Sequence, residues 1–217
     1  MPSFSRLALA AALSVATLSA QAALVARPGG MVYDTVQDIT WLQNWNYAQT
    51  SSIDADGRMD WTTANNWANN LVYGGFDDWR LPTSVNGDGS SFSSGPCGPE
   101  YNCDLSHMGY MFYNNWRVSR GNAFSRGTNA ANLALFSNVQ SWFYWSSTED
   151  PGKPFSNIAW YFGTFDGWQT FDSKTRELYA VAVRYGDVAA SVPEPQTLAL
   201  VLLALGATMV VRRRRPV

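Results

Sequence analysis

The sequence predicts an α+β fold with an antiparallel core. Residues 61–71 and 104–116 carry apolar side chains at helical spacing. Residues 31–41 and 178–185 instead alternate along the chain, as strands with one buried face do, and residues 144–171 hold further strand segments around an Asp-Gly turn. Strands grouped towards both ends of the chain, with helices between them, indicate an α+β architecture.

Residues 31–42 predict a β-hairpin whose turn lies at residues 35–38. A polar loop follows. The next segment, residues 61–71, predicts a helix that buries one face and begins with Asp60 or Thr62 as its N-cap. Its apolar positions are Ala64, Trp67, Ala68 and Leu71.

Gly74 and Gly75 end this helix, and residues 76–83 predict a short strand closed by a proline. A long loop rich in Gly, Ser and Pro spans residues 85–101. A second amphipathic helix is expected to begin with Asp104 as its N-cap. Its apolar face contains Leu105, Met108, Met111, Phe112 and Trp116. One more short helix is expected around residues 133–136.

The final third of the chain predicts β-structure. Residues 144–149 form one strand, and residues 159–165 and 168–171 flank Asp166-Gly167, a pair typical of a type I′ hairpin turn. Residues 178–185 alternate cleanly and predict the last strand. We expect this strand to pair with the first one, which would join both ends of the domain in one sheet.

The N-terminus carries a predicted export signal. Arg6, the apolar residues 7–18 and the small-residue site Ala20-Gln21-Ala22 indicate a secretory signal peptide over residues 1–22. Residues 23–187 then suit one domain with a single core.

The C-terminal tail, residues 188–217, contains three parts. Pro193-Glu194-Pro195 precedes an apolar run of 14 residues, which is followed by Arg212, Arg213, Arg214 and Arg215. A stable membrane-spanning helix needs about 20 residues, so we expect only transient membrane insertion. The arginines stay on the cytoplasmic side, which leaves the domain outside. The tail resembles the PEP-CTERM sorting signal, which implies cleavage by an exosortase-type membrane protease and a final location at the cell surface or in the extracellular matrix. A simple membrane anchor is the alternative.

Charge and cysteine content limit the possible partners. Without the signal and tail, ten basic and sixteen acidic residues leave a net charge of about −6. Such a domain has no electrostatic reason to bind nucleic acid or anionic lipid. Cys97 and Cys103 predict a disulfide in an exported protein, with a metal pair or a reactive thiol as alternatives. His107 is the only histidine, so no Cys/His set can complete a zinc site.

Aromatic residues are unusually frequent, with 10 Trp, 10 Tyr and 11 Phe. Many must fill the core, but aromatic rings exposed on a secreted, weakly charged domain are suited to stack on sugar rings. The candidate ligand-binding residues are Trp142, Tyr144, Trp160, Tyr161, Trp168 and Phe171. Because strand residues alternate, about half of them are expected to face the core. The other half forms either an aromatic platform or a sheet face that loops cover.

Asp54, Asp56 and Asp60 form the one acidic segment that invites comparison with a calcium loop. With Gly57 at the invariant turn position, they fall at loop positions three, five and nine, while the closing position holds Thr63 instead of glutamate. They are therefore candidate Ca²⁺ ligands. The alternative is an Asp-Gly turn followed by an Asp60 helix cap, which needs no ion.

No catalytic residues are predicted. Ser146, Ser147 and Glu149 lie together, but nucleophilic serine chemistry needs a base nearby, and His107 is expected to contact a cap or loop. Arg80 is expected to make a partly buried bidentate bond to a carboxylate or to carbonyls, with Glu149 as the candidate partner.

Three segments together resemble a known domain family. They are Asp78-Trp79-Arg80-Leu81-Pro82-Thr83, Tyr144-Trp145-Ser146-Ser147-Thr148-Glu149 and Ala180-Val181-Ala182-Val183-Arg184. After the opening Val32-Tyr33-Asp34 and Ile39-Thr40-Trp41, they resemble the DUF1566 domain, also named for the C-terminal domain of the Legionella collagen-like adhesin. The resemblance covers about residues 31–186. It implies a C-type-lectin-like fold related to the formylglycine-generating enzyme, with two main helices on a twisted antiparallel sheet and long loops, and structural roles for Trp79, Arg80, Trp145 and Glu149.

The chain departs from this family in two ways. The family's last motif commonly reads Val-Arg-Cys-Val-Arg, and that cysteine is absent from residues 181–184. The adhesin recognises sulfated glycans, whereas this domain is acidic.

From the export signals, the aromatic content and the family resemblance together, we expect an exported, non-enzymatic, carbohydrate-associated binding module. The alternatives are a purely structural envelope or biofilm matrix protein and a secreted glycan-active enzyme.

Overall fold

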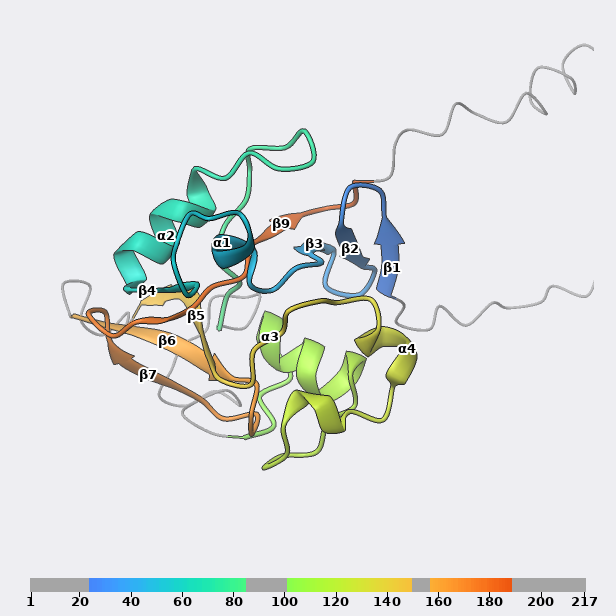
Figure 1. The fold of residues 1–217 in the computed structure, drawn as a ribbon. Coiled ribbons are helices and arrows are strands. Elements are labelled where there is room, and N and C mark those ends of the chain that lie inside the picture. Colours follow the sequence, from blue (N-terminus) through green and yellow to red (C-terminus); the bar gives the residue numbers. More distant parts are fainter. Residues whose placement is uncertain (1–23, 85–100, 150–156, 189–217) are drawn as a thin grey trace, which may run out of the picture.

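The computed structural model describes residues 24–84, 101–149 and 157–188, which form two sheets with short helices around them (Figure 1). The first sheet has the order β1 (Leu24–Arg27), β2 (Met31–Asp34), β3 (Ile39–Leu42) and β9 (Val183–Tyr185). The second has the order β4 (Arg58–Met59), β8 (Leu178–Tyr179), β5 (Phe143–Glu149), β6 (Ile158–Gly163) and β7 (Gln169–Ser173). All neighbours are antiparallel except β5 and β8. The α+β prediction is confirmed.

The hairpin β2–β3 forms as predicted, and Asp34 holds its turn. One carboxylate oxygen of Asp34 accepts hydrogen bonds from the backbone N–H groups of Val36 and Gln37, at 2.9 and 3.1 Å. The other accepts from the side-chain amide of Asn115 at 2.7 Å. Asp34 is only 1% exposed, and a buried carboxylate needs hydrogen-bond partners. Asp34 finds them in the turn and in a helix that is distant in sequence. Burial raises its pKa.

The first sheet contains a strand that the sequence reasoning missed. β1 precedes the predicted hairpin and joins β2 through a turn in which Gly29 and Gly30 both have positive φ. The last strand, β9, therefore pairs with β3 and not with the first strand. Both ends of the domain still join one sheet, but the predicted partner is wrong. The first predicted strand, β2, has β1 on one edge and β3 on the other, so β9 pairs with β3.

The predicted last strand is broken into β8 and β9. Residues 180–182 lie between them and carry the chain from the second sheet to the first. All three are at most 1% exposed, and the carbonyl of Ala182 accepts a hydrogen bond from the N–H of Leu42 at 3.1 Å. Residues 180–182 therefore resemble a strand in sequence because they are buried between the two sheets. They lie outside β8 and β9 and continue neither strand.

Helix α2 (Trp61–Asn69) matches its prediction, and a single turn, α1 (Tyr47–Thr50), precedes it. The side chain of Asp60 accepts a hydrogen bond from the N–H of Thr63 at 2.7 Å, which makes Asp60 the N-cap. The buried face contains Trp61, Ala64, Trp67 and Ala68.

The second predicted helix is shorter and begins later than expected. It consists of α3 (His107–Tyr110) and a π-helical turn, η1 (Met111–Asn115). Its N-cap is Ser106, whose hydroxyl accepts from the N–H of Gly109, and not Asp104. Leu105 precedes the helix and is 47% exposed, so it is not part of the apolar face. The short segments η2 (Phe124–Arg126) and α4 (Ala130–Leu133) follow.

Two further local predictions are wrong. Residues 76–83 form no strand, because Arg80 makes only an isolated bridge to Val183 and Tyr73 one to Phe76. The connection between β6 and β7 spans residues 164–168 and is not a type I′ turn, since Gly167 has positive φ but Asp166 does not. This loop is held from outside, where the Tyr113 hydroxyl donates to the Gly167 carbonyl at 2.7 Å.

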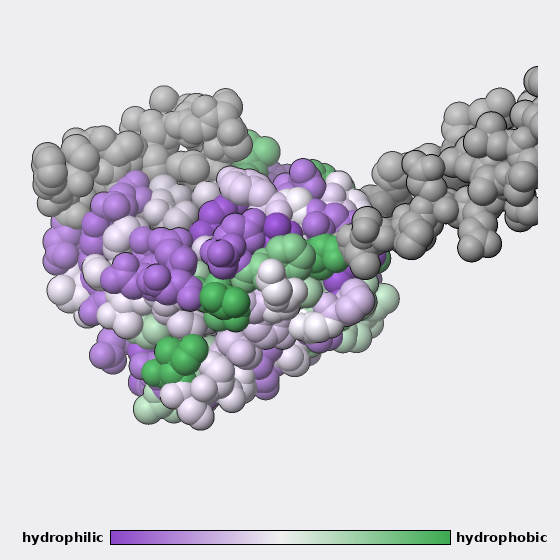
Figure 2. Space-filling view, turned by 90° about the horizontal axis from the view of Figure 1, so that it is seen from above, coloured by the Kyte–Doolittle hydropathy of each residue, from purple (hydrophilic) through white to green (hydrophobic). Residues whose placement is uncertain are grey.

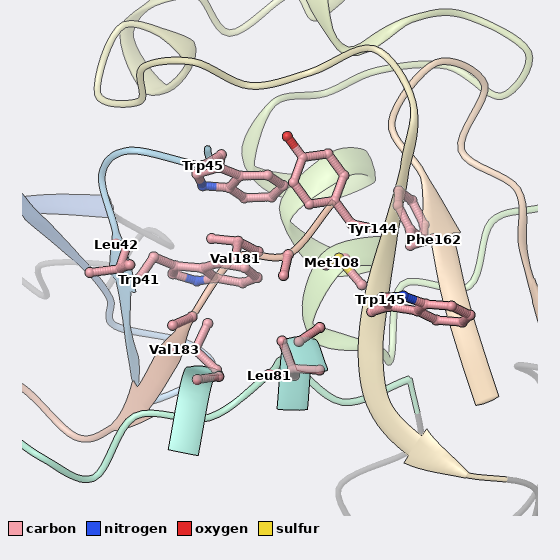
Figure 3. Packing of buried hydrophobic residues seen from close by; sticks show 14 of the residues in the cluster. Trp41, Leu42, Trp45, Leu81, Met108, Tyr144, Trp145, Phe162, Val181 and Val183 are labelled. Atoms are coloured by element: carbon pink, nitrogen blue, oxygen red, sulfur yellow. The ribbon is translucent and has the colours of Figure 1, made fainter. Parts of the chain in front are cut away.

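The buried apolar residues of both sheets and the helices form one cluster. Trp45 lies near its centre, stacked on Trp41 with ring centroids 5.2 Å apart and in contact with Tyr144 at 5.4 Å (Figure 3). The segment around residue 80 lies between two strands of this core. Arg80 and Val183 exchange two backbone hydrogen bonds of 2.8 Å, and the N–H of Ser147 donates to the carbonyl of Pro82 at 2.8 Å.

The predicted signal peptide and sorting tail, with Pro193-Glu194-Pro195 and the four arginines, lie outside the described residues. Within the part of the chain that is described, no helix has the length and apolar character needed to cross a membrane.

Candidate functional site

An open groove of about 640 Å³ lies beside helix α2. One wall is α2 and the residues that follow it, and the other consists of α1 and the loop after it. The lining residues are Tyr47, Ile53, Thr63, Asn66, Trp67, Asn70, Leu71 and Val72. Figure 2 shows the molecule from above relative to Figure 1, and on this side small hydrophobic areas lie among hydrophilic ones.

Helical spacing places the polar side chains of the groove in one row. Thr63 and Asn66 lie at i and i+3 of α2, and Asn70, its C-cap, follows at i+7, so they share one face, and all three are exposed. The Asn70 side-chain amide also donates to the Asn66 carbonyl at 2.8 Å. An asparagine amide supplies donors and an acceptor, and a threonine hydroxyl supplies both. The row therefore offers neutral hydrogen-bonding groups of both kinds to a ligand in the groove.

Part of the apolar lining of the groove belongs to the hydrophobic core or packs against it. Trp67 is only 8% exposed, and its indole N–H has no hydrogen-bond partner among the described residues. The ring of Tyr47 packs edge-on against Tyr73 with centroids 5.0 Å apart. Ile53 and Val72 are 56% and 73% exposed and form apolar rims.

Among the described residues that line the groove, none is charged. Its combination of aromatic and aliphatic surface with amides and a hydroxyl is typical of sites for small neutral polar ligands. A sugar ring offers apolar C–H faces for the rings and hydroxyl groups for the amides. The polar face of α2 is visible in the sequence. A polar helix face that is only solvated has the same pattern, so the sequence does not reveal that α1 and its loop form a second wall opposite it.

Three of the six candidate ligand-binding aromatic residues are buried, which agrees with the expectation that about half of them face the core. Tyr144, Trp160 and Tyr161 are 0%, 2% and 7% exposed. They lie on β5 and β6, the inner strands of the second sheet, whose two faces are both covered, so alternation along the strand does not expose every second residue.

The other three candidates remain accessible. Trp142 and Phe171 are each 44% exposed, and Trp168 is half-buried. Trp168 packs edge-on against Tyr101, with centroids 4.7 Å apart, and Phe171 packs on Trp160 at 5.5 Å. They come from different parts of the second sheet and its loop, and no direct ring contact joins any two of these three within the described residues.

The three candidate calcium ligands have separate partners. One oxygen of Asp54 accepts from the N–H groups of Asp56 and Gly57, at 3.0 and 2.7 Å. Asp56 pairs with Arg58 at 2.5 Å, and Asp60 caps α2. In the part of the chain that the structure describes, no three or more His, Cys, Asp or Glu side chains form a group that could hold a metal ion. The turn-and-cap interpretation therefore describes these residues, because backbone N–H groups and an arginine occupy the carboxylates.

His107 makes the loop contact that was expected. Its Nδ1 accepts a hydrogen bond from the N–H of Thr83 at 3.1 Å, and burial lowers its pKa to about 3. Ser146 is fully buried, and its hydroxyl accepts from the N–H of Thr148 at 3.2 Å. Neither hydrogen bond joins a serine to a base.

The predicted pairing of Arg80 with Glu149 is wrong. Glu149 pairs with Lys174 at 2.6 Å. The Arg80 guanidinium instead lies 3.6 Å from the ring centre of Tyr185 and makes a long hydrogen bond of 3.4 Å to the Leu81 carbonyl. Its Nε and Nη2 have no partner among the described residues, and burial lowers its pKa. Arg80 therefore acts through ring stacking.

The remaining motif residues have structural roles. The indole N–H of Trp79 donates to the Tyr73 carbonyl at 3.2 Å, and that of Trp145 donates to the Met59 carbonyl at 2.9 Å. Cys103 is fully buried and disulfide-bonded, and the chain's other cysteine, Cys97, lies outside the described residues.

No protein-family model, curated protein or solved structure matches this chain. The resemblance to DUF1566 therefore depends only on the sequence motifs, namely the opening strand residues and the three later segments. These motifs lie side by side, since the segment around Arg80 is hydrogen-bonded to residues of both others, Ser147 and Val183.

Proposed function

We propose that this protein is an exported, non-enzymatic binding module for neutral polysaccharide, with a C-type-lectin-like fold of the DUF1566 kind. The observation that carries the proposal is the groove beside α2, which combines aromatic and aliphatic surface with neutral amides and a hydroxyl. A ligand rich in hydroxyl groups satisfies this lining, whereas a sulfated or carboxylated polymer finds no cation among the lining residues that the structure describes. The acidic balance of the mature chain supports the same choice.

The proposed delivery route depends on the two ends of the chain. The signal peptide sends the domain across the inner membrane, and the PEP-CTERM-like tail presents the Pro-Glu-Pro site to an exosortase-type protease, which leaves the domain at the cell surface or in the extracellular matrix. Mass measurement of the exported protein tests this route. Loss of a fragment that ends at Val217 and begins near Pro193 supports it, and an intact C-terminus contradicts it.

The binding experiment is affinity electrophoresis of the full-length protein in gels that contain galactomannan, xyloglucan, dextran, alginate or heparin. We expect retardation by at least one of the three neutral polymers and none by alginate or heparin. The informative variant is Asn66→Ala, because Asn66 lines the groove at an exposed helix position where alanine favours the helix. Its loss of a hydrogen bond to the ligand should weaken binding by about tenfold.

Asn69→Ala is the matched control, because Asn69 is exposed on the same helix but does not line the groove. We expect it to bind as the unmodified protein does. Absence of binding to every polymer would favour a structural matrix protein, and release of sugar products would favour an enzyme. Either result contradicts the proposed function.

A further inference from the structure

A second accessible aromatic surface lies at the start of β5. It consists of Trp142, Phe143 and Phe165, and we call it the Trp142 surface. The Trp142 ring centroid is 5.2 Å from that of Phe143 and 6.1 Å from that of Phe165, with only 35° between the planes of Trp142 and Phe165. Trp142 is 44% exposed and the two phenylalanines are partly exposed. The three rings are therefore in mutual contact, and each is at least partly exposed.

The backbone beneath Trp142 is fixed on both sides. The N–H of Trp142 donates to the hydroxyl of Thr164 at 3.1 Å, and its carbonyl accepts from the N–H of Thr164 at 2.9 Å. The Thr164 hydroxyl also donates to the carbonyl of Gln140, and Thr164 is 1% exposed. An exposed ring on a rigid backbone loses little conformational entropy when it binds a ligand.

Two charged groups near this surface have polar partners within the described residues. The Arg176 guanidinium lies 5.1 Å from the ring centre of Phe143 and forms an ion pair with Asp172. Asp166, the residue after Phe165, forms no ion pair within the described residues, but one of its oxygens accepts from the N–H of Trp168 at 2.9 Å. The surface thus offers aromatic ring faces beside one ion pair and one hydrogen-bonded carboxylate, and such ring faces suit the same sugar chemistry as the groove.

The Trp142 surface is separate from the groove. The two share no residue. Trp142 directly precedes β5, whereas α2 contacts the middle of that strand, where the indole N–H of Trp61 donates to the Ser146 carbonyl at 2.8 Å. Figure 1 shows α2 at one end of the second sheet and the connection between β6 and β7 at the other.

We infer that the Trp142 surface is a second contact for the same neutral polysaccharide, so that one molecule holds two segments of polymer at once. This inference rests on the proposed function of the groove. A polysaccharide repeats one unit along its length, so a second site for that unit raises the apparent affinity for polymer without a new contact at the first site. The domain then acts as a cross-linker of a polysaccharide matrix.

The test compares polymer with a short oligosaccharide of the same repeat, prepared from whichever of galactomannan, xyloglucan and dextran retards the full-length protein. We expect the protein to bind immobilised polymer about 100-fold more tightly than the oligosaccharide. Trp142→Ala should lose at least about tenfold of the polymer affinity and keep the oligosaccharide affinity of the groove. Phe171→Ala is the matched control, because Phe171 is equally exposed and lies outside the Trp142 surface; it should behave as the unmodified protein.

Retained oligosaccharide binding shows that Trp142→Ala is folded, and Phe165→Ala repeats the test if it is not. The inference is overturned if Trp142→Ala binds polymer as tightly as the unmodified protein, or if folded Trp142→Ala also loses the oligosaccharide, which makes the two surfaces one site. It is equally overturned if the protein forms dimers without sugar that Trp142→Ala abolishes, because the surface then binds a second copy. These results leave the groove intact, whereas absence of all binding removes the proposed function itself.

Discussion

At the scale of single residues, buried polar side chains in this protein bind backbone groups. The carboxylate of Asp34 organises the β2–β3 turn, the ring of His107 accepts a backbone N–H, and the hydroxyl of Thr164 binds the backbone next to Trp142. Each therefore fixes the position of a loop that has no ladder of its own. A buried polar group without a hydrogen-bond partner costs free energy, so loss of any of these partners is expected to lower the free energy of unfolding.

The buried imidazole of His107 makes stability dependent on pH. Its pKa is lowered from 6.5 to about 3, first by burial and then by the charge of Arg80. Unfolding therefore lets His107 take up a proton below pH 6.5. The stabilising contribution is complete above pH 6.5 and is lost as the pH falls towards 3, by at most about 1.4 kcal/mol per pH unit.

Urea unfolding between pH 7 and pH 5 checks this prediction. His107→Gln keeps an acceptor for the Thr83 N–H but cannot be protonated, so we expect its free energy of unfolding to change less with pH than that of the unmodified protein. Asp34 and Asp166 have pKa values raised by burial, so their effect has the opposite sign, because folding then favours the protonated carboxyl group. Equal slopes for the two proteins contradict the assignment to His107.

At the scale of elements, α2 serves the fold and the groove with different faces. Trp61, Ala64 and Ala68 pack into the core, while Asn66 and Asn70 line the groove. Its start depends on a local interaction, the hydrogen bond from Thr63 to the Asp60 side chain. A loss at this cap is expected to weaken the wall of the groove together with the helix.

Asp60→Ala removes the N-cap of α2. We expect it to lower the free energy of unfolding by about 1 kcal/mol, whereas Asp60→Ser, which keeps a capping oxygen, should cost only a small part of this. Thermal and urea unfolding followed by circular dichroism measure both.

Because Asp54, Asp56 and Asp60 already have protein partners, added Ca²⁺ should leave the melting temperature unchanged relative to chelator. An increase with Ca²⁺ that Asp60→Ala removes would restore the calcium site.

At the scale of the whole molecule, one tryptophan connects the two sheets with the helices. Trp45 is 1% exposed and contacts Trp41 of β3, Tyr144 of β5 and Trp116 at the end of η1, with ring centroids 4.9 to 5.4 Å apart (Figure 3). The same core extends through residues 180–182, which cross from one sheet to the other. The sheets are therefore expected to unfold together.

Trp45→Ala removes this shared contact. We expect it to lower the free energy of unfolding by about 3–5 kcal/mol, while Trp45→Phe, which keeps part of the ring surface, should cost less. Tryptophan fluorescence and far-ultraviolet circular dichroism should give one coincident transition for the unmodified protein. Two separate transitions would show that the sheets unfold independently.

Predictions from sequence succeeded where neighbours along the chain decide the structure. The hairpin at residues 31–42 and helix α2 follow from periodicity and from Asp60, which acts within its own turn. β1 was missed, although its four residues precede a Pro-Gly-Gly turn, because a strand so short shows little alternation. Ser106 replaced Asp104 as the N-cap because both types are good caps and only the packed chain selects between them.

The sequence by itself determined the α+β class, the hairpin and the position of α2, since each depends on local pattern or composition. The export signals at the two ends stay predictions. Only the tertiary structure decided that β9 pairs with β3, that Tyr144 and Trp160 are buried while Trp142 is exposed, and that α2 faces a second wall across a groove. The physical reason is that burial depends on what covers each face of a strand or helix. That cover comes from residues far apart in the chain, about which the alternation of a single segment carries no information.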